Sequence, residues 1–154
     1  ALNFIQEDDV LVASVSGHQG CAAAGDRVMG MLKNCGGAGF VTDGPMRDYA
    51  GLVEVGLPAW CTGLTPASPF TKGPATVGLP INIGGQTIES GDVIVADRDG
   101  VVVVPNRKID FVINRLSKVA DLEYSLDAEV RGGLKIPDPV KEMILDDNVK
   151  FVDD

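Results

Sequence analysis

The feature that most constrains the fold is a strand, a helix and a second strand in close succession. Residues 10–15 form an apolar run typical of a buried strand, and residues 21–33 are rich in helix-forming side chains. Residues 39–42 predict the second strand. Because a helical crossover joins the two strands, we expect them to pair in parallel. The sequence therefore predicts an α/β fold.

The remainder of the chain is richer in strand signals. Glycine, proline and apolar runs predict a helical piece at 48–55 and five further strands: 58–62, 77–83, 86–88, 93–97 and 101–105. The dipeptide Gly84-Gly85 is typical of a two-residue hairpin turn. Four consecutive valines, Val101–Val104, favour a strand that is covered on both faces. Together these strands predict a mixed β core with flanking helices.

The C-terminal part is expected to be helical. Residues 109–131 carry apolar side chains at helical spacing, and Gly132-Gly133 ends the pattern. Residues 134–154 combine a Pro-Asp-Pro turn with a short helix and are interpreted as a C-terminal tail that docks on a neighbour. With 154 residues and no internal boundary, the chain is predicted to be one domain, residues 1–154.

Composition argues against several functional classes. The chain has 13 Lys and Arg against 22 Asp and Glu, a net charge of −9, whereas a phosphate-backbone binder needs clustered cations. No apolar run reaches the length of a membrane span, and no signal peptide is recognisable. Three cysteines without a CxxC pair favour reduced thiols. We therefore expect a cytoplasmic protein that binds neither nucleic acid nor membrane.

Candidate chemistry lies where the first two strands end. Asp26 follows Gly25 within the predicted helix at 21–33 or at its first turn, and Arg47-Asp48 follow the turn Asp43-Gly44-Pro45 after the second strand. Ligand-binding groups of open α/β sheets gather at the carboxyl ends of parallel strands. Asp26, Arg47 and Asp48 can therefore converge at one site. The alternative from spacing alone is a solvated Arg–Asp ion pair beside a helix-capping Asp.

These residues carry a family resemblance. Asp26, twenty intervening residues and Arg47-Asp48, with the strand and Asp-Gly turn between them, resemble the RraA-like family. The later strands resemble the family's closing strands, so the resemblance covers roughly residues 2 to 133. It implies the swivelling β/β/α fold of that family. Members include 4-hydroxy-4-methyl-2-oxoglutarate aldolases with oxaloacetate decarboxylase activity, and RraA, a regulator of ribonuclease E.

The resemblance implies a divalent-metal lyase that releases pyruvate. Asp48 would be the direct ligand of Mg²⁺ or Mn²⁺, and Asp26 would hold a water of that cation. Arg47 would bind the oxygens of a small 2-keto acid substrate. The backbone N–H groups of Arg27 and Val28 would receive its carboxylate. In the family, the site lies between subunits of a homotrimer, and two trimers can pair as a hexamer. Glu123 would therefore reach the site from a neighbouring subunit.

Two departures from the family pattern bear on this expectation. Gly51 stands where the family usually carries a third acid, and the chain begins after an N-terminal helical region that family members possess. Aldolases of the family have Asp at the position of Asp26, where regulators have Gly, and this favours an enzyme. The alternatives are a non-catalytic RraA-like regulator that binds a ribonuclease or another protein, and an oligomer in which Gly51 marks a silent site.

Overall fold

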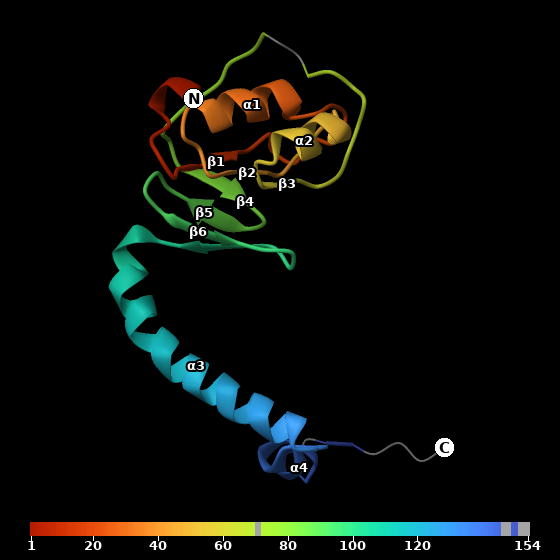
Figure 1. Cartoon of the computed structure of the whole chain (residues 1–154), viewed down its shortest axis with the longest axis vertical. Coiled ribbons are helices and arrows are strands. Elements are labelled where there is room, and N and C mark those ends of the chain that lie inside the picture. Colours follow the sequence, from red (N-terminus) through yellow and green to blue (C-terminus); the bar gives the residue numbers. More distant parts are fainter. Residues whose placement is uncertain (70–71, 146–148, 151–154) are drawn as a thin grey trace. The chain divides into compact units, whose positions relative to one another are not determined.

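The structure is a computed structural model that describes residues 1–69, 72–145 and 149–150 (Figure 1). It contains two compact units, Ala1–Ile109 and Asp110–Asp154. Of the predicted tail at 134–154, residues 146–148 and 151–154 lie outside the described part. The prediction of one domain over the whole chain stays a prediction.

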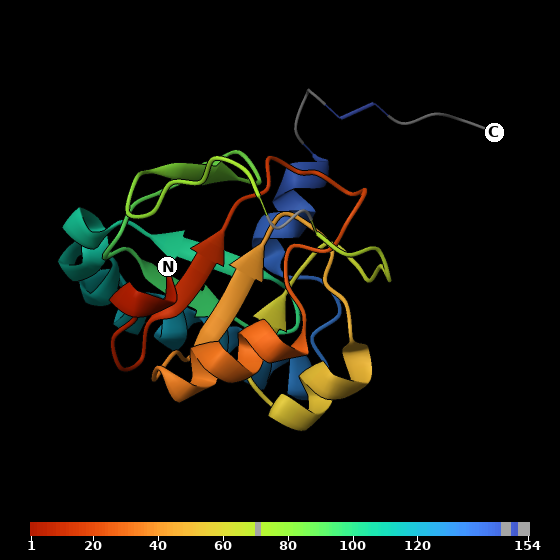
Figure 2. The ribbon, with the colours of Figure 1, turned by 90° about the horizontal axis from the view of Figure 1, so that it is seen from above.

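The first unit is built on a parallel sheet of three strands in the order β1 (Val10–Ala13), β2 (Gly39–Thr42) and β3 (Ala59–Trp60). The expected parallel pairing of the first two strands is confirmed, because Val10 pairs with Gly39 and Ala13 with Thr42. Helices α1 (Asp26–Asn34) and α2 (Tyr49–Val55) connect the strands and cover one face of the sheet (Figures 1 and 2). A short 3₁₀ helix, Leu2–Phe4, precedes β1.

The sheet continues beyond its strand ends as a second, shorter parallel ladder. Ala24 forms a parallel bridge with Met46, and Met46 forms another with Leu64. The Arg47 N–H donates to the Ala24 carbonyl at 3.1 Å, and the Met46 N–H donates to the Gly63 carbonyl at 2.9 Å. The three segments that follow β1, β2 and β3 are thus held side by side in the same order as the strands. They place the segments of Asp26 and Arg47-Asp48 next to each other.

This ladder corrects the predicted start of the first helix. The sequence predicts a helix from residue 21, whereas α1 begins at Asp26. Residues 21–25 are rich in alanine, which favours a helix locally. They are irregular instead, with bends at Cys21 and Ala23, because Ala24 forms a bridge with Met46 and the Ala23 N–H donates to the Pro45 carbonyl at 2.7 Å. Tertiary pairing has overridden local propensity.

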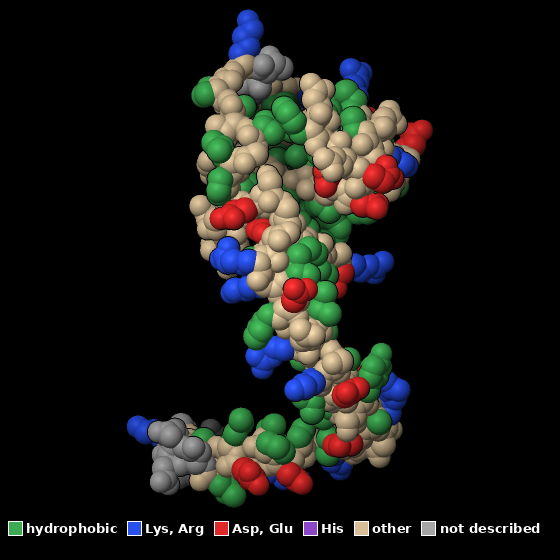
Figure 3. Space-filling view, turned by 90° about the vertical axis from the view of Figure 1, so that its left-hand side faces the viewer, with side chains coloured by type: hydrophobic (Ala, Val, Ile, Leu, Met, Phe, Trp, Pro, Cys, Tyr) green, Lys and Arg blue, Asp and Glu red, His purple; other side chains and the backbone are tan. Residues whose placement is uncertain are grey.

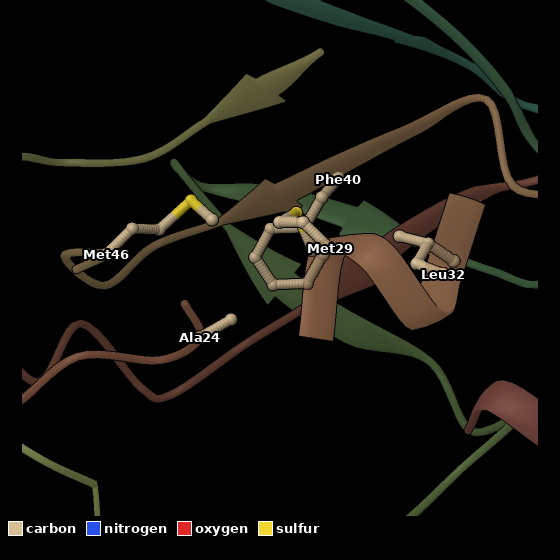
Figure 4. Close-up of a cluster of buried hydrophobic side chains, with 5 residues drawn as sticks. All are labelled: Ala24, Met29, Leu32, Phe40 and Met46. Atoms are coloured by element: carbon tan, nitrogen blue, oxygen red, sulfur yellow. The ribbon is translucent and has the colours of Figure 1, made fainter. Parts of the chain in front are cut away.

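The core of the first unit lies between α1 and the sheet (Figure 4). Its members come from both ladders and from the helix: Ala24, Met29, Leu32, Phe40 and Met46. Met29, Leu32 and Met46 are fully buried. Truncating a buried methionine to alanine costs roughly 2–5 kcal/mol. Because Met46 directly precedes Arg47, the core fixes the backbone from which the candidate site projects.

Two antiparallel hairpins complete the first unit. β4 (Ile81–Ile83) pairs with β5 (Gln86–Ile88) across Gly84-Gly85, whose φ angles of +58° and +78° suit a two-residue turn. β6 (Val93–Ala96) pairs with β7 (Val101–Val104). The hairpins lie on the side of the sheet away from α1 and α2 (Figure 1).

One expectation for β7 is wrong. The four valines predicted a strand covered on both faces, but Val102 is 61% exposed. Its partner across the hairpin, Val95, is 58% exposed. The sheet of β6 and β7 has only two strands, so one of its faces is left open in the described structure.

The 3₁₀ helix Asn106–Lys108 leads into the second unit, which contains α3 (Ile109–Arg131) and α4 (Asp138–Ile144). The predicted bounds of the long helix are confirmed, and Gly133 ends it with a φ of +97°. Apolar side chains reach the surface along α3, as Figure 3 shows: Phe111, Ile113, Leu116, Val119, Leu122, Leu126 and Val130. Within the described residues, neither this helix nor any other has the length and apolarity to span a membrane.

Candidate functional site

Arg47 and Asp48 form the centre of the candidate site. The Arg47 Nε atom lies 3.2 Å from Asp48 Oδ2, and the Arg47 Nη1 group donates to Ser68 Oγ at 2.6 Å. The Nε–H is buried and makes no aligned hydrogen bond with any described residue, so its contact with Asp48 is an ion pair only. A buried, charged donor without an aligned hydrogen bond is costly unless a ligand supplies the acceptor.

Asp48 has an unusual backbone. It is the N-cap residue of α2 and adopts the left-handed conformation, with φ +62° and ψ +46°. Such conformations cost of order 1 kcal/mol or more in residues other than glycine, although Asp tolerates them better than most. The conformation lets the chain turn sharply from the second ladder into α2. Strain of this kind concentrates at functional sites, which supports a functional role for Asp48.

Asp26 approaches the same place from α1. It is the first residue of that helix, and its N-cap residue is Gly25. A methyl group at Gly25 would lie 2.5 Å from Asp48 Oδ2 and 3.0 Å from Arg47 Cγ. Only glycine therefore lets the start of α1 come this close to Arg47 and Asp48.

Asp26 itself lies against α2. A methyl group at Gly51, in the first turn of α2, would lie 2.7 Å from the Asp26 Cβ and 2.9 Å from its carboxyl carbon. Position 51 is the one at which the sequence lacks the expected third acid. The carboxylate of Asp26 occupies the space beside that position, within one helical turn of Asp48. The structure thus brings Arg47 and Asp48 into direct contact and sets Asp26 beside the same helix turn.

The remaining predicted site residues, Arg27, Val28 and Glu123, form no hydrogen bond or ion pair with Arg47 or Asp48 in the described part of the chain. The Arg27 N–H donates to Asp26 Oδ1 at 2.6 Å, and the Val28 N–H donates to the Gly25 carbonyl at 3.1 Å. Both amides already have acceptors within the chain, so a bound carboxylate would have to replace those acceptors. Glu123 lies exposed on α3 and makes no ion pair among the residues described.

Asp43, at the end of β2, anchors the loop after β1. Its carboxylate accepts hydrogen bonds from the Val15 N–H (2.6 Å), the Ser14 hydroxyl (2.8 Å) and the Gly17 N–H (2.9 Å). Partial burial raises the pKa of Asp43, but these three hydrogen bonds outweigh burial and hold the pKa below its ordinary value of 3.8. Asp43 is therefore a structural anchor between the two ladders and is not a free carboxylate.

Two open depressions flank the site. One, of about 350 Å³, is lined by Arg47, Asp48, Tyr49, Leu64, Thr65 and Pro66. The other, of about 400 Å³, is lined by Asp26, Arg27, Gly30, Gly51, Glu54 and Val55. No sequence motif marks Ser68, Tyr49 or Glu54 as site residues, because their position depends on the ladder and on the packing of α2.

The donor set fits a hard divalent cation. Among the described residues there is no cluster of three or more His, Cys, Asp and Glu side chains that could enclose a metal. Mg²⁺ does not need one, since it keeps several waters and is commonly held by one or two carboxylates. The carboxylate of Asp48, which accepts no hydrogen bond from any described residue and lies beside the Arg47 guanidinium, is one such ligand, and the carboxylate of Asp26 lies next to position 51 in the first turn of α2.

Comparison with known proteins gives consistent results. The profile of a family described as RraA-like (Aldolase/RraA) matches residues 1–103. A protein of Halalkalibacterium halodurans named "Putative 4-hydroxy-4-methyl-2-oxoglutarate aldolase" is 40% identical over 110 residues, 71% of this chain and 52% of that protein. A protein of the same name from Alkalilimnicola ehrlichii is 34% identical over 106 residues, 69% of this chain and 66% of that protein.

A solved structure also matches. It is Streptomyces coelicolor RraAS2, described as an unusual member of the RNase ES inhibitor RraA protein family. The identity is 35% and the TM-score 0.76, over 82% of this chain and 65% of the other. In each of these three comparisons, the present chain spans less than two thirds of the other protein's length.

Proposed function

We propose that this chain, which belongs to the RraA-like family, is a divalent-metal-dependent lyase that releases pyruvate. Its substrates would be 4-hydroxy-2-keto diacids of the 4-hydroxy-4-methyl-2-oxoglutarate type, or oxaloacetate. The relatives of that name make an aldolase the first candidate. The observation that carries the proposal is the buried Nε–H of Arg47, which has an ion pair with Asp48 but no aligned hydrogen bond, while Asp26 lies beside the first turn of α2, the helix that Asp48 caps.

Arg47 is the proposed substrate-binding and catalytic group. Its Nη1 group donates to Ser68 and its Nε atom forms an ion pair with Asp48, so the guanidinium is held from two sides, and its Nε–H has no aligned hydrogen-bond acceptor among the described residues. A planar guanidinium matches the adjacent oxygens of a 2-keto acid and can bind two of them at once. Both reactions develop negative charge on the keto oxygen, and a fixed cation lowers the barrier by stabilising that charge.

The two carboxylates are the proposed cation ligands. Asp48 would hold Mg²⁺ or Mn²⁺ directly and Asp26 through a water. When bound, the cation would act as a Lewis acid toward the keto oxygen. The Asp48 carboxylate forms an ion pair with Arg47, and Gly25 removes the bulk that would separate the start of α1 from both residues.

The two cleavages share their electron flow. In the retro-aldol reaction the C3–C4 bond breaks, the C4 hydroxyl loses its proton and C4 becomes a carbonyl. In oxaloacetate decarboxylation the C3–C4 bond breaks and C4 leaves as CO₂. In both, the electron pair moves toward the C2 keto oxygen, and C3 then gains a proton to give pyruvate. A water held by Asp26 is the proposed acceptor of the hydroxyl proton.

We further propose that the active form is a homotrimer, or a hexamer of paired trimers, in which Glu123 comes from a neighbouring subunit. Glu123 lies at helical spacing with Leu116, Val119, Leu126 and Val130 on α3, side chains that are all exposed. If these apolar side chains of α3 pack against a neighbouring subunit, Glu123 is brought to that subunit's site. Replacing Leu116 and Leu126 with Ser should then lower both the oligomer mass and the activity.

Pyruvate release from oxaloacetate tests the proposed function. The rate is measured with Mg²⁺, with Mn²⁺ and with EDTA, after subtracting the rate with the metal alone. The proposal expects turnover that requires the cation and that Asp26→Ala abolishes. Asp138→Asn, a change at an exposed acid of α4, is the control and should leave turnover intact. Turnover unaffected by EDTA, or none from a folded chain, would overturn the proposal.

A second candidate is a non-catalytic regulator that binds a ribonuclease or another protein. It is favoured by the likeness to a member of an RNase inhibitor family. Asp26 separates the two candidates, because only the enzyme needs this carboxylate. A regulator would bind its partner equally well with Asp26→Ala and would show no metal-dependent turnover.

A further inference from the structure

We infer that the side chain of Arg27 binds the distal carboxylate of a diacid substrate, in the depression between α1 and α2. This inference rests on the proposed function, in which Arg47 and the cation hold the keto-acid end. It assigns the side chain of Arg27 a role separate from that of its backbone N–H, which already donates to Asp26.

The shape of the surface supports this position. The depression of about 400 Å³ is lined by Asp26 and Arg27 of α1 and by Glu54 and Val55 of α2. Its size is within the usual range of small-ligand sites. Gly30 leaves open space on the α1 side of the depression, because a methyl group there would meet only Val55 Cγ2, at 4.0 Å. A ligand held at Asp26 can therefore extend along this depression.

Charge determines what the depression accepts. The Arg27 side chain is exposed and forms no ion pair with any residue that the structure describes. It is the one cationic residue of the lining, which also carries the carboxylates of Asp26 and Glu54, and neither carboxylate is within ion-pair distance of the Arg27 guanidinium. An unpaired guanidinium favours a carboxylate, which it can bind through two parallel hydrogen bonds. Glu54 would weaken the binding of that carboxylate by repulsion.

The geometry thus predicts discrimination between keto diacids and keto monoacids. Arg27 would contribute only where the ligand carries a second carboxylate. Two ligands of equal chain length isolate this group: 2-oxoglutarate and 2-oxopentanoate, which differ only in the terminal carboxylate. Calorimetric dissociation constants of both are measured with Mg²⁺ present, for the wild-type chain, Arg27→Gln and Glu54→Gln.

The wild-type chain should bind 2-oxoglutarate more tightly than 2-oxopentanoate. Arg27→Gln should weaken 2-oxoglutarate binding by about 10- to 100-fold and leave 2-oxopentanoate unchanged. Glu54→Gln should strengthen 2-oxoglutarate binding by about two- to fivefold, the opposite sign. Arg98→Gln makes the same charge change at an exposed turn of the first unit and should alter neither constant.

The outcomes separate this inference from the proposed function. Metal-dependent turnover of oxaloacetate with an unchanged ligand preference in Arg27→Gln would overturn the inference alone. Absence of turnover with an Arg27-dependent preference for 2-oxoglutarate would overturn the lyase and keep the inference. A wild-type chain that binds 2-oxoglutarate no better than 2-oxopentanoate would also overturn the inference.

Discussion

Gly51 and Asp26 are in contact, and this contact leaves no room for a side chain at position 51. A methyl group there would lie 2.7 Å from the Asp26 Cβ, closer than side-chain carbons approach in proteins. In this chain the carboxylate beside the first turn of α2 comes from α1. The glycine at position 51 is therefore compatible with an acidic site, because Asp26 fills the space.

The first prediction follows from this contact. Gly51→Ala should improve the helix propensity of α2 by about 1 kcal/mol and at the same time displace Asp26. We expect thermal stability to be retained and metal-dependent pyruvate release to fall by about tenfold or more. Gly30→Ala is the stability control, since a methyl group there meets no atom closer than 4.0 Å. Full activity in Gly51→Ala would show that the position of Asp26 is unimportant.

The second prediction separates backbone strain from chemistry at Asp48. Asp48→Gly should fold with unchanged or greater stability, because glycine adopts a φ of +62° without strain. Asp48→Ala should be less stable than Asp48→Gly by about 1 kcal/mol. Both variants should lose metal-dependent turnover, measured alongside chemical denaturation. If Asp48→Gly is stable and keeps its turnover, the Asp48 carboxylate is not needed for activity, and Asp48 is not a site residue.

The third prediction concerns the orientation of Arg47. Ser68→Ala removes the acceptor of its Nη1 group, a hydrogen bond of 2.6 Å. Losing it should raise the KM for oxaloacetate by about two- to tenfold with little change in kcat. Arg47→Lys, which lacks the fork, should reduce kcat/KM by about 10- to 100-fold. A KM unchanged in Ser68→Ala would show that Ser68 does not orient the guanidinium.

Much of the fold could be predicted because its patterns are local. The second strand, at 39–42, and the long helix, at 109–131, have the bounds that their apolar patterns indicate. The parallel pairing of β1 with β2 followed from the intervening helix. The predicted helix at residues 21–25 and the predicted burial of Val102 were wrong because neither is set by local sequence. The conformation of residues 21–25 depends on the bridge from Ala24 to Met46, which is distant in the sequence. The exposure of Val102 depends on the sheet of β6 and β7 having only two strands.

The site could be predicted in its main residues but not in its contacts. Asp26 and Arg47-Asp48 were found because strand ends and the spacing between them are visible in the sequence. The contact of Gly51 with Asp26 and the hydrogen bond from Arg47 to Ser68 were not, because they depend on the angle of α2 and on a proline-rich loop. Arg27 was assigned through its backbone, whereas the structure exposes its side chain.

The fourth prediction concerns acid stability and Asp43. Because hydrogen bonds hold its folded-state pKa below the unfolded value near 3.8, the ionised group stabilises the fold above that pH. The contribution is lost as the pH falls through the folded-state pKa. Asp43→Asn should therefore cost about 1–2 kcal/mol at pH 7 and less below pH 3.8. Denaturation curves across this range check it, and a cost that stays constant with pH would contradict it.

The central claim is that Asp48 and Asp26 hold a divalent cation beside Arg47, and Mn²⁺ binding followed by electron paramagnetic resonance tests it most directly. The account predicts one bound ion per chain. Asp48→Asn should weaken binding by about 100-fold or more, and Asp26→Asn by about 10-fold. Asp138→Asn, the control at an exposed acid, should bind as the wild type does. Equal affinity in the wild type and Asp48→Asn would contradict the account.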